Sequence, residues 1–181
     1  MNNSPGDESV GAAVTLGLLA AWAVHDAEEL ALGPRWIREH LPELRARFPG
    51  APDGLWRALE GVDEREFAVA VGVMAAVVGA GAVAGRRSGG RSATYQAMLN
   101  GFGLHGLVHL AQAAAVRGRT PGSVTSAAVV IPFSLWARGR LRRAGVLRPA
   151  RPADAVLGLG LATAAVVASH TVARRFSRRS H

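Results

Sequence analysis

The chain contains no cysteine, and this absence removes several kinds of chemistry at once. Disulfides, thiolate metal sites, iron–sulfur clusters and cysteine nucleophiles are all excluded. Lysine is absent as well, so all 21 basic residues are arginine. Together with the abundance of Ala, Gly and Val, this is typical of a GC-rich coding bias and carries no functional weight. Aromatic residues make up only 6% of the chain and do not interleave with the arginines as base stacking requires, so we expect no nucleic-acid partner.

Acidic residues are scarce in the second part of the chain. Twelve of the thirteen lie in residues 1–66, whereas fifteen of the 21 arginines follow that segment. These arginines form short clusters between long apolar runs: Arg86 and Arg87; Arg138, Arg140, Arg142 and Arg143; Arg174, Arg175, Arg178 and Arg179. Such clusters are typical of loops that flank membrane spans, where arginine meets anionic headgroups. We therefore expect membrane lipids as partners.

Long uncharged runs predict an all-α fold, a polytopic membrane helix bundle with about five transmembrane spans. A hydrocarbon core of about 30 Å requires roughly 20 mostly apolar residues in a helix. The expected spans are residues 10–32, 67–84, 93–116, 120–137 and 153–172. A soluble all-α domain is the alternative, but uncharged runs as long as the second are unusual in one. We expect a single domain, residues 1–181, integral to a bacterial cytoplasmic membrane.

Residues 33–66 form the only long connector, which we expect to lie outside the membrane. This connector has mixed charge, four prolines and two tryptophans that suit the membrane interface. We expect two short amphipathic helices in it, around residues 34–47 and 54–64. Further along, Pro132 predicts a kink in the fourth span. Residues 174–181 form a basic tail.

Polar side chains collect at one end of the expected bundle. Because successive spans alternate in direction, the ends of the first, third and fifth spans share one side with the start of the fourth. The polar residues at these places are His25, Asp26, Glu28, Glu29, His105, His109, Gln112, Thr120, Thr125 and His170. Asp26 is expected to point away from the others, towards the membrane boundary. This common end is therefore the expected position of a polar site.

Helix geometry narrows the site to five residues. His25, Glu28 and Glu29 stand at i, i+3 and i+4 and share one helix face, and His105 and His109 are i, i+4 neighbours. A carboxylate near the bilayer centre costs about 2.5–3.5 kcal/mol on insertion scales. A divalent metal satisfies carboxylates and imidazoles together. We therefore predict that these five residues bind a divalent metal, zinc or iron.

A second group of residues is expected around these ligands. It comprises Asn100, Gln112, Arg119, Thr120 and Thr125. Less specific interpretations remain open: solvated acids at a helix end, histidines that bond neighbouring helices in the core, and a tight turn at Thr120-Pro121-Gly122.

The motif His25-Asp26-Ala27-Glu28-Glu29 resembles the signature of the HXXEE family, small predicted membrane proteins named for it. The resemblance continues in Asn100–His109 (NGFGLHGLVH) and in Arg119–Gly122 with Thr125, and covers roughly residues 10–172. The family has no established activity. The resemblance therefore implies a membrane location and this choice of site residues, and it supplies no reaction.

A second family, the intramembrane CAAX-type proteases, is similar in pairing a double glutamate with histidines on other spans. Its pattern has an arginine four residues after the second glutamate, where this chain has Gly33. Its Phe-x-x-x-His spacing is also not met, because His105 follows Phe102 by three residues. This similarity serves as an analogy only.

The leading hypothesis is a membrane-embedded metal-dependent enzyme that acts on an apolar or lipid-like substrate. With zinc, His25, His105, His109 and one glutamate bind the metal, and the other glutamate is the general base of a hydrolysis. With two irons, Glu28 and Glu29 bridge or chelate them, and the chemistry is oxidation. Hydrolysis is favoured because the known histidine-rich membrane oxygenases use more histidine ligands. The alternatives are a small proton- or cation-coupled transporter, or a non-catalytic membrane protein whose polar residues hold helices together.

Overall fold

The computed structural model describes residues 10–149, which are largely helical and contain no strand. The elements are α1 (Ala12–Thr15), α2 (Gly17–Arg47), α3 (Asp53–Glu60), α4 (Glu64–Arg87), α5 (Ala93–Val116), α6 (Ser123–Thr125), the π-helix η1 (Ser126–Val130) and α7 (Ile131–Arg143). The all-α expectation is confirmed. The expected span 153–172, with His170, and the tail 174–181 lie outside the described residues.

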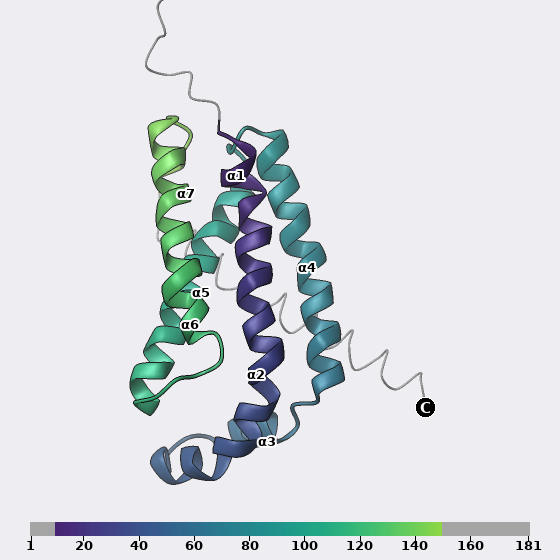
Figure 1. Cartoon of the computed structure of the whole chain (residues 1–181), viewed down its shortest axis with the longest axis vertical. Coiled ribbons are helices and arrows are strands. Elements are labelled where there is room, and N and C mark those ends of the chain that lie inside the picture. The colour runs from purple at the N-terminus through teal and green to yellow at the C-terminus, as the bar shows by residue number, and fades with distance from the viewer. Residues whose placement is uncertain (1–9, 150–181) are drawn as a thin grey trace, which may run out of the picture.

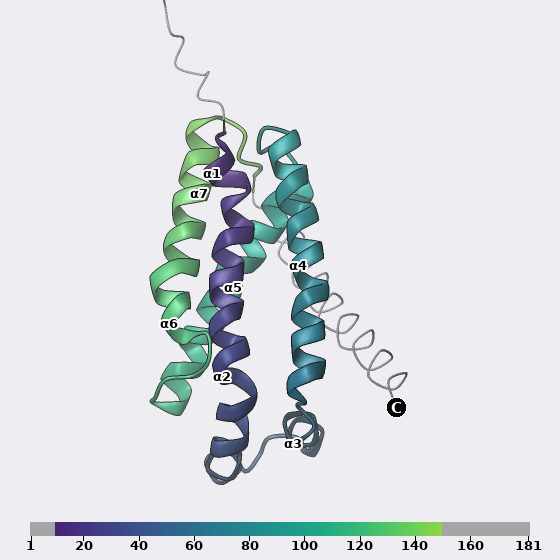
Figure 2. The same cartoon turned by 45° about the vertical axis from the view of Figure 1, so that its right-hand side comes forward.

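The long helices form a bundle in which α2 and α5 face each other. In Figures 1 and 2, α5 passes behind α2, with α4 on one side and α7 on the other. Helix α2 packs against α4 and η1, and α5 packs against α4, η1 and α7. Both flanks of the space between α2 and α5 are therefore occupied by other helices.

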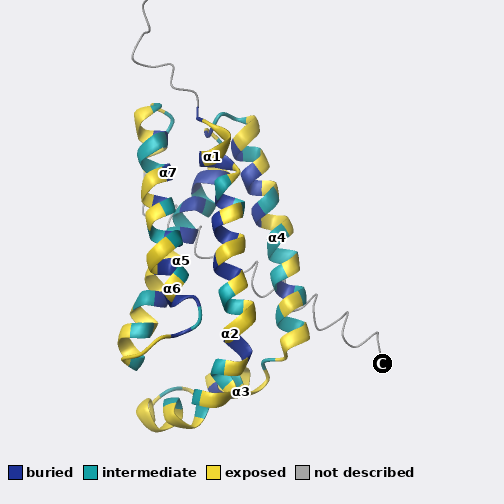
Figure 3. Cartoon of the chain, viewed as in Figure 1, coloured by how far each residue is buried: buried dark blue, intermediate teal, exposed yellow. Residues whose placement is uncertain are grey.

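The core of the bundle is apolar along most of its length. Leu18 on α2, Leu99 on α5, and Val130 and Leu141 on the α6–η1–α7 segment are almost fully buried in one cluster. Figure 3 shows the buried positions on the inward sides of these helices, while α4 is largely intermediate or exposed. The polar residues of the site thus adjoin a mainly apolar core, which also contains buried polar side chains such as Gln96, Ser126 and Ser134.

Helices α4 and α5 approach closely at the end where their hairpin closes. A Cβ atom at Gly85 would lie 2.5 Å from the Tyr95 ring, and one at Gly81 would lie 2.1 Å from the sulfur of Met98. The Tyr95 hydroxyl donates to the Val14 carbonyl at 2.5 Å, which also ties the start of the bundle to α5. Glycine at these two positions is what allows the backbones to approach.

The ends of α5 coincide with the expected third span, residues 93–116. Ser92 caps the first turn by accepting a hydrogen bond from the Tyr95 backbone N–H. At the other end Arg117 is left-handed (φ 54°), and Arg47 donates to the Val116 carbonyl at 3.1 Å. This bond joins the far ends of α2 and α5.

The first long helix does not end near Leu32, as the sequence suggested. Helix α2 continues through Pro34 and Pro42 to Arg47 and bends towards its lower end (Figure 1). A helix can pass through a proline when it bends, because the bend separates the ring from the preceding turn. Of the two short helices expected between residues 33 and 66, only the second is separate, as α3. Arg38 of the extension pairs with Glu64 at 2.7 Å.

This extension of α2 is charged and exposed. Arg35 donates to Glu39 at 2.8 Å, and this hydrogen bond lowers the pKa of the Glu39 carboxyl. Trp36 stacks on His40, with ring centroids 4.4 Å apart. Trp56 of α3, which we expected at the interface, is buried in the structure, and the Arg45 guanidinium lies 5.7 Å from its ring centroid.

The segment expected as a fourth span, residues 120–137, is divided instead of continuous. A short α6 leads into the π-helix η1, and α7 begins at Ile131. Pro132 has no N–H to donate to the preceding turn, so a widened turn accommodates it better than a regular α-helical one. The irregularity predicted at Pro132 is present, as a π-helix.

Among residues 10–149, one helix is long and apolar enough to cross a membrane by length and composition. This helix is α4. Helices α2 and α5 carry the polar residues of the site, and α7 is only 13 residues long. The number of spans predicted from the sequence is therefore not confirmed.

Two glycines of α4 allow a matched test of the close packing. Gly85→Ala should destabilise the folded protein by about 1–3 kcal/mol, because the new methyl group overlaps the Tyr95 ring. Gly72→Ala should be neutral or stabilising by about 0.5–1 kcal/mol, since a Cβ there meets nothing within 4 Å. Thermal unfolding in detergent, followed by circular dichroism, measures both. Equal stability of the two variants would contradict this account of the α4–α5 contact.

Candidate metal centre

Four side chains from α2 and α5 converge at the centre of the bundle. The Nε2 atom of His105 lies 3.0 Å from the Nε2 atoms of both His25 and His109. The Nε2 atom of His109 lies 3.0 Å from a carboxylate oxygen of Glu29, and that of His25 lies 4.0 Å from the same oxygen. All four donor atoms lie within 4.8 Å of one another. The two helix stripes predicted from the sequence therefore meet.

Hydrogen bonding alone does not satisfy this cluster. An imidazole nitrogen offers either one proton or one lone pair, directed along a single line. The Nε2 atom of His105 has two nitrogen neighbours at 3.0 Å and can form a well-directed bond with only one of them. A cation between the three rings removes this conflict, because each nitrogen then presents a lone pair to it.

The spacing fits one divalent metal. In a tetrahedral zinc site with Zn–N bonds of 2.0–2.1 Å, neighbouring ligand atoms are separated by about 3.3 Å. The two N···N distances of 3.0 Å are a few tenths of an ångström shorter, so a small outward movement of the rings accommodates the ion. Three imidazoles are a donor set that zinc accepts in catalytic sites, and the Glu29 carboxylate lies beside them.

Thr125 orients two residues of the motif. Its hydroxyl oxygen lies 2.8 Å from Nδ1 of His25 and 3.4 Å from the Gly122 carbonyl, to which it donates. The hydroxyl then accepts from His25 Nδ1–H, which leaves the lone pair of Nε2 facing the cluster. The backbone N–H of Thr125 donates to Glu28 at 2.8 Å.

Glu28 therefore occupies a different place from Glu29. The sequence placed both glutamates among the metal ligands, but Glu28 is outside the group of four donors and is bonded to the backbone of the α6–η1 segment. On the helix, Glu28 and Glu29 lie on opposite sides of the His25 direction. Each therefore reaches a different neighbour of α2.

The loop before α6 lies directly on the two buried imidazoles. Gly122 has a positive φ of 78°, and a Cβ atom there would lie 2.8 Å from the His109 ring and 2.9 Å from that of His25. Only glycine fits this position, both for its backbone conformation and for the space. The turn expected at Thr120-Pro121-Gly122 thus closes one side of the site. The Nδ1 atom of His109 is buried beneath it, beside the backbone of Pro121.

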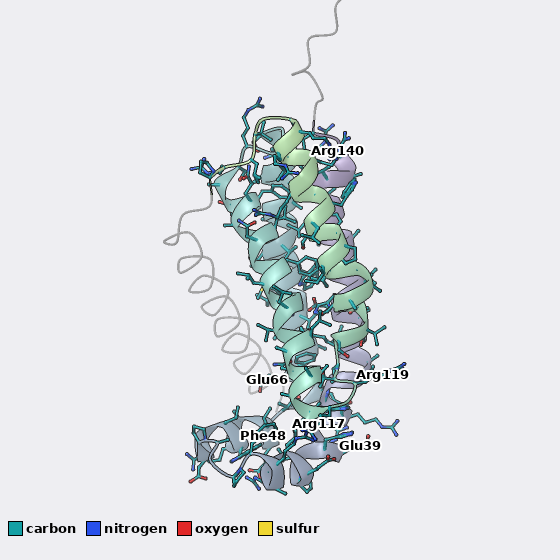
Figure 4. The ribbon with its side chains drawn as sticks, turned by 90° about the vertical axis from the view of Figure 1, so that its left-hand side faces the viewer. Glu39, Phe48, Glu66, Arg117, Arg119 and Arg140 are labelled. Atoms are coloured by element: carbon teal, nitrogen blue, oxygen red, sulfur yellow. The ribbon has the colours of Figure 1, made fainter. Side chains whose placement is uncertain are left out.

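The remaining predicted residues are spread more widely. Thr120 is buried at the loop, its hydroxyl without a partner, and Gln112 is exposed on α5. Asn100 lies five residues before His105 on α5, and its side chain accepts a hydrogen bond from Arg138 of α7, not from a residue of the metal centre. Arg119 is exposed and lies at the α3 end of the molecule, opposite Arg140 (Figure 4).

Asp26 departs from the sequence-based expectation. It was expected to point towards the membrane boundary, yet only 7% of it is exposed. It adjoins Trp22 and His25 in the buried stripe of α2. We predicted exposure because Asp26 is charged. Trp22, one helical turn earlier, is apolar and lies on the same face, and its burial indicates that this face points inward.

A family model described as "Protein of unknown function with HXXEE motif" matches residues 16–137, more than half of the chain. The chain belongs to the HXXEE family. No curated protein and no solved structure matches it. In this HXXEE protein the match runs from the start of α2 into α7 and includes all four donors and Thr125. The family description gives no activity, so function is argued from the geometry.

Thr125 allows a test of how the HXXEE histidine is oriented. Thr125→Val should weaken Zn²⁺ affinity about 10–100-fold, because it removes the acceptor for His25 Nδ1–H. Thr125→Ser keeps a hydroxyl and should retain most of the affinity. Competition titration with a zinc-sensitive dye measures both variants. Wild-type affinity in Thr125→Val would show that this hydrogen bond does not orient a metal ligand.

Proposed function

We propose that this chain is an integral membrane protein with a single-metal hydrolytic centre inside its helix bundle. The membrane part of the proposal is supported by the outer surface of the helices. Leu107, Val108 and Leu135 are each at least half exposed, and only 17% of the residues in the most apolar stretch of α4 are buried. Soluble monomers rarely expose such extended apolar surface. In a bilayer the same surface faces lipid, and α5, with no charged residue, is long enough to span it.

The observation that carries the metal proposal is the convergence of three imidazole Nε2 atoms, with that of His105 3.0 Å from the other two and all within 4.8 Å of one another. His25, His105 and His109 are the proposed metal ligands. Three neutral ligands leave the full charge of a divalent ion available to polarise bound water, as in zinc hydrolytic sites with one open position. Glu29, with 18% of its side chain exposed, lies beside these ligands, 3.0 Å from Nε2 of His109.

The donor count favours one metal over two. Di-iron centres in helical bundles use several carboxylates in addition to two histidines. Here the described residues bring one carboxylate to the three histidines, because Glu28 is bonded to Thr125. This argues for zinc-type hydrolysis and against the di-iron oxidation considered from the sequence.

In the proposed reaction a carbonyl compound is cleaved by water. A bound divalent ion would lower the pKa of its water towards about 7 and polarise the carbonyl. Glu29 accepts a proton from the attacking water, the hydroxide oxygen adds to the carbonyl carbon, and the bond to the leaving group breaks. Glu29 then returns the proton to the leaving group. Thr125 and Glu28 hold α2 and the α6–η1 segment in register while this occurs.

Proton or cation transport is the second candidate, and the chain of contacts Glu29–His109–His105–His25 motivates it. A relay through the membrane needs a polar route on both sides of the cluster. His25 is fully buried, and beyond it the interior is formed by Leu18, Leu99 and their apolar neighbours. The contacts therefore favour a closed centre with one accessible edge.

Metal content is the first test. Protein purified in detergent without a His-tag or chelator should contain about one metal ion per chain by elemental mass spectrometry. His105→Ala and His109→Ala should lose it, because each removes one of three ligands. His40→Ala is the matched control, since His40 stacks on Trp36 outside the centre. Folded wild-type protein without stoichiometric metal would refute the proposed function.

The two glutamates of the motif should behave differently when each is changed to glutamine. Glu29→Gln should keep the metal, because the three histidines remain, but should abolish hydrolysis by removing the proton acceptor. Glu28→Gln should keep both metal and activity within about tenfold, since an amide oxygen can still accept from Thr125 N–H. Metal analysis and turnover of long-chain acyl esters measure these effects. Loss of metal in Glu29→Gln would instead make Glu29 a ligand.

A further inference from the structure

The four donors are not equally accessible. His25 and His109 are buried, whereas His105 is exposed and Glu29 is partly exposed. The buried pair is covered by the Gly122 backbone, and Phe102 packs edge-on against His25 with ring centroids 6.0 Å apart. A ligand therefore reaches the centre at the edge formed by His105 and Glu29.

The surface around this edge is apolar on both helices. On α5, Leu104 and Val108 are 48% and 53% exposed and lie one residue before and three residues after His105. On α2, Leu32 is 48% exposed and lies three residues after Glu29, on the same helix face. Helix α5 contains no Asp, Glu or Arg. A charged, hydrated ligand finds no counter-charge on α5, whereas a hydrocarbon chain finds continuous apolar contact.

The space beside His105 is also open. Gly101 lies one turn before His105, and a Cβ atom placed on it would meet nothing within 4 Å. Gly103 and Gly106, by contrast, face α7 and η1, where a Cβ atom would touch Ser134 and Val130 respectively. The open glycine is therefore on the accessible side of α5, and the closed ones are on the packed side.

We propose that substrate enters the centre laterally across α5, from the hydrocarbon phase, and that it is a long-chain acyl compound with a hydrolysable carbonyl group. This inference rests on the proposed metal-dependent function. The acyl chain lies along Leu104 and Val108, and the carbonyl reaches the edge between His105 and Glu29. In this arrangement the metal centre binds the carbonyl group, and the apolar surface of α5 binds the hydrocarbon chain of the substrate.

The test uses Co²⁺-loaded protein in detergent and two hydroxamates that differ only in chain length. Hydroxamate binding changes the visible spectrum of Co²⁺, so affinity is measured without a known substrate. Dodecanohydroxamate should bind at least 100-fold more tightly than acetohydroxamate. Gly101→Leu should weaken dodecanohydroxamate binding at least tenfold while leaving the Co²⁺ spectrum of the free protein unchanged, because its side chain fills the open space beside His105.

Gly72→Leu is the matched control. Gly72 lies on α4, and a Cβ there also meets nothing within 4 Å, so the same substitution should leave hydroxamate binding unchanged. This control also accounts for partition of the long chain into detergent. If Co²⁺ binds but both hydroxamates bind equally and Gly101→Leu has no effect, lateral entry is wrong and the metal centre stands. If Co²⁺ does not bind, the proposed function fails and lateral entry fails with it.

Discussion

The arrangement of this bundle depends on satisfying polar groups in an apolar interior. Three imidazoles and a carboxylate lie on helices whose other inward residues are mostly aliphatic or aromatic. Burying an unpaired polar group costs about 1–3 kcal/mol in proteins, so partners for these groups stabilise the fold. Thr125 partners Nδ1 of His25 and the carboxylate of Glu28. These contacts leave the Nε2 atoms of His25, His105 and His109 without a fully satisfying partner. The spacing of these three atoms fits a cation.

The irregular parts of the chain serve this same requirement. The left-handed Gly122 brings backbone against two imidazoles, where any side chain would collide. The π-helix that follows begins at Ser126, directly after Thr125, and widened turns of this kind are frequent at functional sites. A regular helix from residue 120 would place backbone and side chains differently relative to α2. The π-helix therefore lies between Thr125, which contacts the site, and Pro132, which cannot donate a backbone hydrogen bond.

Much of this arrangement follows from sequence spacing alone. The limits of α5, and the meeting of its two histidines with His25, were predicted from apolar runs and helix periodicity. Sequence spacing did not predict the features that depend on contacts between distant parts of the chain. The extension of α2 through Pro34 is supported by ion pairs such as Arg38–Glu64, whose partners are distant in sequence. The burial of Asp26 and the separation of the two glutamates likewise depend on which neighbour each side chain meets, and periodicity does not specify neighbours.

The separation of the glutamates gives the two acids of the motif different partners. Successive residues on a helix are about 100° apart, so positions i+3 and i+4 fall on either side of position i by roughly 60° and 40°. Glu28 is on one side and reaches the backbone of Thr125, and Glu29 is on the other and reaches His109. His25 between them contacts both neighbours, through Nδ1 to Thr125 and through Nε2 to His105. One turn of helix therefore connects α2 to two different elements, and each glutamate adds a second contact to an element that His25 already reaches.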